Sequence, residues 1–146
     1  MYLNMKPSEM LAVLGTIDPV SQAAGTVTTG WLDQAVYLSV MAVIQTGVLG
    51  ASATVDAKLQ QATDSSGTGA KDITGKAITQ IVKASGDNKQ AIINMKEADL
   101  DTEGGFRYVR LSITVGVAAS LVGAAVYGAM PRYAAVSNQA ATVQVI

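Results

Sequence analysis

Hydrophobic and polar residues alternate with a period close to two along most of the chain after Thr26. The clearest case is the stretch 53–63, in which every second residue from Ala53 to Leu59 is apolar and the residues between are polar. Successive side chains of a strand point to opposite faces, so this period predicts half-buried β-strands. Similar patterns predict strands at residues 26–31, 35–46, 76–83, 89–97, 106–117 and 120–130.

Turn-forming residues separate these predicted strands. The stretches 64–69, 72–75 and 85–88 are rich in Asp, Ser and Gly, which favour loops and tight turns. About seven or eight short strands joined by such turns are typical of an antiparallel β-sandwich. We therefore expect an all-β fold.

Two uncharged runs, residues 35–55 and 111–130, raise a different possibility, because each is about as long as a membrane-spanning helix. A two-helix membrane hairpin is thus an alternative to a set of buried strands. Glycines interrupt both runs, and Val, Ile, Thr and Ser are common in them, which favours strands. We expect no membrane insertion.

The two ends of the chain differ from the middle. Residues 7–14 predict a short helical turn with Ser8 as its cap and Gly15 at its end. Residues 132–146 carry no charge after Arg132 and end in Val-Gln-Val-Ile. The predicted organisation is an N-terminal arm (1–25), a sandwich domain (26–131) and a C-terminal arm (132–146).

Apolar arms need partners, which are either neighbouring subunits or the chain's own domain. We expect neighbouring subunits, with docking on the chain's own domain as the alternative. The candidate interaction residues are the apolar members of the arms: Met10, Leu11, Val13, Leu14, Tyr133, Val136, Val143, Val145 and Ile146.

The composition argues against catalysis, metal binding and nucleic-acid binding. The chain has no Cys and no His, which removes thiolates, imidazole bases and the commonest metal ligands. Its net charge is −1 and its basic residues are scattered, which argues against nucleic-acid binding. Only 14% of the residues are charged and 49% are hydrophobic, which suggests that part of the exterior is covered by partners. We expect no catalytic, cofactor or metal site.

Two weaker patterns point to ligands. Residues 99–104 resemble the opening of a calcium loop, but the twelfth position of that loop holds Arg110 instead of Glu. A solvated acidic turn explains them better, and a weak surface cation site stays open. The aromatic residues, Trp31 and Tyr127 among them, could form a sugar-stacking platform, although packing in the core or at an interface is the commoner role of aromatics in strands.

A resemblance adds to this interpretation. Residues 53–67 (ATVDAKLQQATDSSG), residues 71–79 (KDITGKAIT) and residues 106–114 (FRYVRLSIT) are similar to segments of small structural proteins of tailed phages and prophages. The resemblance covers roughly residues 30–130 and excludes both arms. It implies a jelly-roll-like sandwich that decorates or cements a capsid, or completes a head or tail, and it carries no catalytic residues over.

The function expected from these observations is that of a non-enzymatic capsid decoration or cement protein. Its partners would be the major capsid protein or other virion subunits, with homo-oligomers formed as well. It would be found in the virion, assembled in the cytoplasm of the bacterial host. The alternatives are another head or tail component, such as a head-spike, tail or baseplate subunit, and a carbohydrate-binding β-sandwich.

Overall fold

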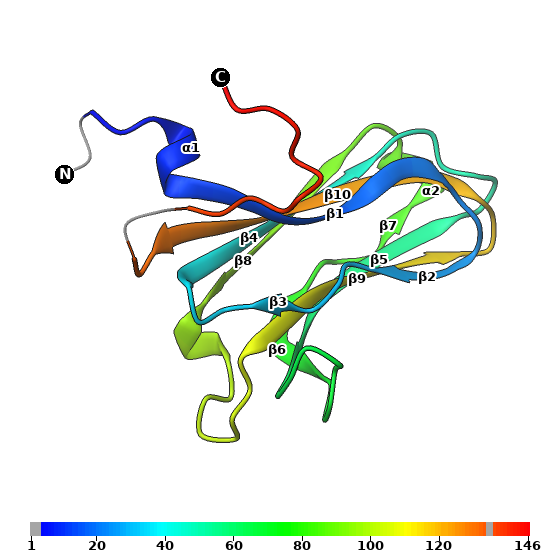
Figure 1. Cartoon of the computed structure of the whole chain (residues 1–146). Helices are drawn as coiled ribbons and strands as arrows, with labels where there is room; N and C mark the ends of the chain where they lie inside the picture. Colours follow the sequence, from blue (N-terminus) through cyan, green and yellow to red (C-terminus); the bar gives the residue numbers. More distant parts are fainter. Residues whose placement is uncertain (1–3, 134–135) are drawn as a thin grey trace.

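The computed structural model describes residues 4–133 and 136–146, which form two β-sheets packed face to face (Figure 1). Sheet A contains, in spatial order, β1 (Leu11–Gln22), β10 (Ser120–Pro131), β4 (Tyr37–Thr46) and β8 (Gln90–Lys96). The main path of sheet B contains β2 (Gly25–Thr28), β9 (Tyr108–Gly116), β5 (Thr54–Ala62) and β6 (Lys71–Ala77). Two short strands join sheet B: β3 (Leu32–Asp33) pairs with β9, and β7 (Ile81–Val82) pairs with β5.

The connections give the fold its class. All strand pairs among the described residues are antiparallel, and the chain crosses repeatedly between the two sheets, so that β4, β8 and β10 return to sheet A from sheet B. The strand orders β1-β10-β4-β8 and β2-β9-β5-β6 are those of a jelly roll. The predicted all-β, jelly-roll-like sandwich is confirmed.

The core lies between the sheets and follows the predicted alternation most closely on β5 and β9. Leu59 lies opposite Leu111, and Ala57 lies opposite Ile113, all of them buried. Full burial of one such aliphatic side chain stabilises the fold by roughly 1.5–3 kcal/mol. Buried side chains of sheet A close the core from the other side: Ile17, Val40, Ala42, Ile44, Ile93, Met95, Val122 and Val126.

The start of β4 departs from the predicted alternation. A period of two places Leu38 on the same face as the buried Val40, but Leu38 is 39% exposed, whereas Tyr37 is 4% exposed. The neighbouring end of β10 is irregular, because Met130 has a positive φ of 53° and does not pair with Leu38, although the register is the same on either side of it. This local irregularity changes which side chains face the core.

The segment between β5 and β8 also differs from the prediction. Residues 72–75, predicted as a turn, belong to β6, where Gly75 has a φ of 73° and the pairing with β5 is irregular. Of the predicted strand 76–83, only its first two residues, in β6, and Ile81–Val82, in β7, are strand. The predicted hairpin turn at 85–88 overlaps a short helix, α2 (Lys83–Gly86).

The expected N-terminal arm is wrong for most of its length. Helix α1 is only Pro7–Met10, and its N-cap is Lys6 instead of Ser8. The next twelve residues form β1, which pairs with β10 along its length and belongs to the sandwich. Register shifts after Val13 and after Ile17 interrupt the alternation of β1, which is why a period of two is not visible in its sequence.

The two uncharged runs contain β4 and β10, strands of sheet A. No helix within the described residues has both the length and the apolar character needed to cross a membrane.

Candidate interaction surface

The outer face of sheet A, which points away from the core, is apolar. The strand register places two rows of side chains across its centre. One row holds Thr16, Ala125, Val43 and Ile92, and the next holds Val13, Tyr127, Met41 and Asn94. Neither row contains a charged residue. We call these two rows, together with Leu121 and Gln45 beside them, the apolar face.

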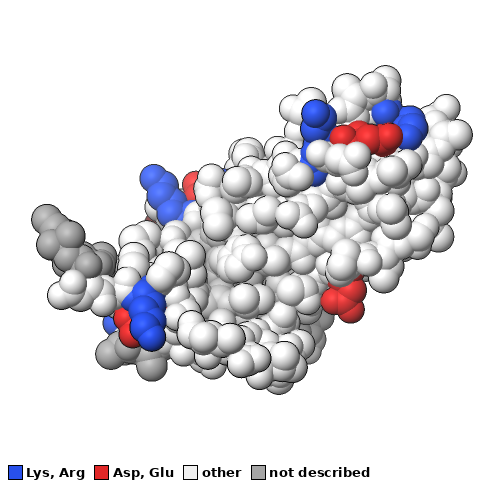
Figure 2. Space-filling model, turned by 90° about the horizontal axis from the view of Figure 1, so that it is seen from above, with Lys and Arg blue, Asp and Glu red and all other residues white. Residues whose placement is uncertain are grey.

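Solvent reaches this surface. Ile92 is 56% exposed and Leu121 is 45% exposed, while Met41 and Val43 are half-buried. A hollow of about 210 Å³ lies between Pro19 in the β1 bulge and Tyr127. Figure 2 views the molecule from the side on which sheet A lies in Figure 1, and its charged side chains gather at the ends and edges of a broad uncharged area.

The outer face of sheet B is polar. Lys58 pairs with Asp72 at 2.8 Å, and the Arg110 guanidinium donates to Gln60 at 2.9 Å. Further polar side chains, such as Thr114, complete this surface. The two outer faces of the sandwich therefore differ. The apolar face is the candidate interaction surface, since contiguous exposed apolar patches tend to mark interaction sites.

The predicted interaction residues of the N-terminal arm lie in structured elements. Met10 ends α1 and is half-buried, while Leu11, Val13 and Leu14 belong to β1 and are half-buried as well. Val13 is part of the apolar face, but Leu14 lies beside Gly128 and Tyr37. The structure thus brings one of these four residues to the candidate surface.

The predicted residues of the C-terminal arm fall into two groups. Val136 is half-buried, whereas Tyr133 is 72% exposed. At the tip, Val143 is 96%, Val145 56% and Ile146 98% exposed. The described residues of this arm form no helix or strand, and the tip carries apolar side chains that its own domain leaves largely uncovered.

The middle of the C-terminal arm docks on its own domain, at the free edge of β1. The Val13 N–H donates to the Asn138 side chain at 2.8 Å, and the Gln139 N–H donates to the Val13 carbonyl at 2.7 Å. The Tyr37 hydroxyl exchanges hydrogen bonds with the backbone of Ser137. The expectation that the whole arm packs on a neighbour is therefore wrong for residues 137–139, because the open edge of β1 offers backbone partners within the same chain.

The acidic turn predicted as a possible cation site is occupied by the chain's own groups. The Lys96 backbone N–H and the Lys76 ammonium hold the pKa of Asp99 below its ordinary value. The Lys71 ammonium and the Gly104 N–H do the same for the pKa of Asp101. Within the described residues, no three acidic side chains come together as a metal site would need.

Trp31 and Tyr127, two of the aromatic residues considered for a sugar-stacking platform, lie apart. Tyr127 lies on the apolar face of sheet A. Trp31 precedes β3 of sheet B, where the Arg110 guanidinium lies 4.4 Å from its ring and where its ring fills the space beside Gly67. The two rings therefore cannot bind one sugar together.

The apolar face is a site that the sequence analysis missed. Its signal was present, since Met41, Val43 and Gln45 alternate with the core residues of β4 and include no charge. Without the strand order, however, nothing in the sequence places Val43 beside Ile92 and Ala125.

Comparisons with known proteins leave the family open. No protein-family model and no curated protein matches the chain. Among solved structures, it is similar to the cowpea mosaic virus empty virus-like particle, with 9% identity, TM-score 0.43 and coverage of 94% of this chain and 88% of that one. The infectious bursal disease virus Gx strain matches with 16% identity and TM-score 0.37, over 87% of this chain and 34% of that one.

A third similar structure belongs to the Bacillus endospore appendages, described as disulfide-linked pili, with 13% identity, TM-score 0.34 and coverage of 89% and 99%. Two of these three structures are viral particles and the third is a pilus. All three TM-scores are below 0.5, so these similarities carry no inference about function. The chain is a jelly-roll-like sandwich with one apolar outer face.

Proposed function

We propose that this chain is a non-enzymatic structural subunit of a tailed-phage virion, and specifically a decoration or cement protein that binds the capsid shell. The observation that carries the proposal is the apolar face of sheet A. The similarity of residues 53–67, 71–79 and 106–114 to small phage structural proteins supports it from the sequence side. Its partners would be the major capsid protein or other virion subunits, met in the cytoplasm of a bacterial host.

The contrast between the two sheets gives the proposal its physical reason. The cores of protein interfaces are depleted of charge, and burying an unpaired charge is unfavourable. The apolar face meets this requirement across four strands, whereas the outer face of sheet B would bring Lys58, Asp72 and Arg110 into any contact. Sheet A is therefore the side that faces the shell, and many copies bound in this way stabilise it through additive weak contacts.

Charges introduced on the apolar face test the proposal. The double variant Ile92→Asp, Leu121→Asp changes two exposed side chains, so folding should be little affected. We expect capsid binding to weaken by about tenfold or more, because each carboxylate would be buried without a partner. The measurement is co-sedimentation with particles assembled from the major capsid protein encoded in the same genome.

The double variant Thr74→Asp, Ala77→Asp is the matched control, since it adds the same two charges at exposed positions of sheet B. It should bind like the unmodified chain. Failure of the unmodified chain to sediment with the particles, or equal binding by the Ile92→Asp, Leu121→Asp variant, would overturn the proposed role.

A further inference from the structure

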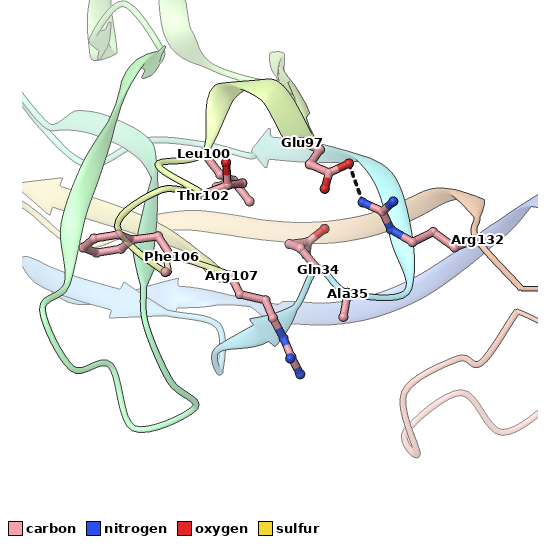
Figure 3. A pocket seen from close by; sticks show the side chains of 9 residues that line it. Gln34, Ala35, Glu97, Leu100, Thr102, Phe106, Arg107 and Arg132 are labelled. Carbon is pink, nitrogen blue, oxygen red and sulfur yellow. Dashed lines mark ion pairs between the residues drawn. The ribbon is translucent and has the colours of Figure 1, made fainter.

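A pocket of about 330 Å³ lies at one end of the sandwich, away from the apolar face (Figure 3). Four segments distant in the sequence meet there: the residues after β3, the 3-10 turn Glu97–Asp99, the loop before β9 and the residue after β10. The pocket lining includes the side chains of Gln34, Glu97, Thr102, Phe106, Arg107 and Arg132. Pockets that hold small ligands start at about this volume.

The side chain of Gln34 is the anomaly of this pocket. Gln34 is 5% exposed, and neither its amide nitrogen nor its amide oxygen has a hydrogen-bond partner among the described residues. In Figure 3 the amide points toward the space bordered by Glu97 and Arg132. A buried amide without partners is unfavourable by roughly 1–3 kcal/mol, so native proteins rarely keep one without a role.

The position of Gln34 is fixed by its surroundings. Its backbone N–H donates to the Arg107 carbonyl at 3.1 Å, and β3 before it pairs with β9. The Arg107 guanidinium turns away from the pocket and pairs with Asp33, which lowers the pKa of that carboxyl. The amide is therefore held in place by backbone contacts, with its donor and acceptor both free.

The charges around the pocket cancel. Glu97 and Arg132 form an ion pair on the wall facing Gln34. Arg107 is neutralised by Asp33 in the same way. No charge of either sign is left over in this lining, so the pocket does not favour an ionic ligand.

The free groups suit a ligand that carries neighbouring donors and acceptors. The Gln34 amide offers both a donor and an acceptor, and the Thr102 hydroxyl can act as either. The Glu97–Arg132 ion pair adds a carboxylate and a guanidinium. Phe106 supplies apolar surface beside them, with the Lys71 ammonium 4.1 Å from the centroid of its ring, and Leu100 lies there with 8% of its surface exposed. Adjacent hydroxyl groups on a ring with apolar C–H faces match this combination.

We propose that this pocket binds a neutral saccharide, with adjacent hydroxyl groups of one sugar ring paired to the Gln34 amide. The site is independent of the apolar face, so a virion subunit attached through sheet A would keep it open to solvent. It also differs from the platform with Trp31 and Tyr127 that the sequence left as an alternative, and neither residue lines it.

The test uses the full chain and ligand-observed saturation-transfer NMR with millimolar D-glucose, D-galactose, D-mannose and N-acetyl-D-glucosamine. D-glucuronate is added as an anionic sugar and N-methylacetamide as a mimic of a peptide group. We expect a signal from at least one neutral sugar and a weaker one or none from the other two probes. Gln34→Leu should reduce the affinity at least tenfold, because it keeps the shape but removes both hydrogen-bonding groups.

The thermal stability of the same variant is a second measurement, and no loss is expected in it. Gln34→Leu should leave the thermal midpoint unchanged or raise it, because it removes a buried amide that has no partner. Loss of binding is then not a result of misfolding. Gln90→Leu, the same change at an exposed position of β8 outside the apolar face, is the control and should keep sugar binding.

Three outcomes would overturn the proposal. One is the absence of a signal from every neutral sugar with the unmodified chain. Another is a signal that survives Gln34→Leu. The third is binding of only D-glucuronate or only N-methylacetamide, which would assign the pocket to an anion or to a peptide group.

Discussion

Single residues decide how the two ends of the chain are held, and Gly128 is the clearest case. A Cβ atom at Gly128 would lie 2.7 Å from Cγ of Tyr37 and 2.9 Å from Cδ1 of Leu14. Both distances are well below van der Waals contact. The absence of a side chain at this position is therefore what allows the buried Tyr37 ring to reach the backbone of Ser137.

Gly128→Ala should lower the free energy of unfolding by about 1–3 kcal/mol, the usual effect of overpacking a buried position. Urea denaturation followed by circular dichroism measures the change. Gly30→Ala is the control, because a Cβ atom at Gly30 would meet nothing within 4 Å. Equal midpoints for the two variants would show that the ring of Tyr37 moves aside freely.

At the scale of elements, β1 and the C-terminal segment depend on each other. Strand β1 lies at the edge of sheet A, and residues 137–139 satisfy backbone groups of Val13 at that edge. The Tyr37 hydroxyl adds two hydrogen bonds to Ser137, with distances of 3.1 and 3.2 Å. An edge strand covered in this way is protected from pairing with other chains.

Tyr37→Phe should release the C-terminal segment without disturbing the ring beneath it. We expect faster amide hydrogen exchange in residues 136–142 and a loss of stability of about 1 kcal/mol, the usual net contribution of a hydrogen bond. Hydrogen exchange with mass spectrometry makes the comparison. Tyr108→Phe makes the same chemical change in sheet B and should leave the segment protected. Unchanged exchange in Tyr37→Phe would mean that Asn138 and Gln139 hold the segment alone.

The sequence was sufficient to predict the strands in which apolar and polar residues alternate regularly. Strands β5, β8 and β9 were predicted, because apolar and polar side chains alternate along them. Strand β1 was missed because two register shifts and Pro19 break this alternation. The pocket at Gln34 could not be predicted at all, since it depends on four segments that only the completed fold brings together.

For the whole molecule, the acidic side chains set the response to pH. Six aspartates have pKa values below the ordinary 3.8: Asp33, Asp64, Asp72, Asp87, Asp99 and Asp101. Hydrogen bonds from a Lys or Arg side chain are the largest cause for four of them, and Thr68 and the Lys96 backbone N–H are the largest for Asp64 and Asp99. The folded state therefore binds fewer protons than the unfolded chain near pH 4.

Stability contributed by these aspartates is present above their unfolded pKa and is lost as pH falls through the lower folded values. The chain has no His, the side chain that normally titrates near neutrality. We expect a constant free energy of unfolding between about pH 5 and 7 and a decline below about pH 4. Urea midpoints across this range provide the measurement, and a transition centred near pH 6 would contradict it.

The paired charges of sheet B have a consequence for anything built from this chain. If sheet A is turned inward, the surroundings meet Lys58 beside Asp72 and Arg107 beside Asp33. Such a coat is zwitterionic: it binds water strongly but has little net charge to attract counter-ions or polyelectrolytes. A particle covered by it would hide whatever electrostatic potential the underlying shell carries.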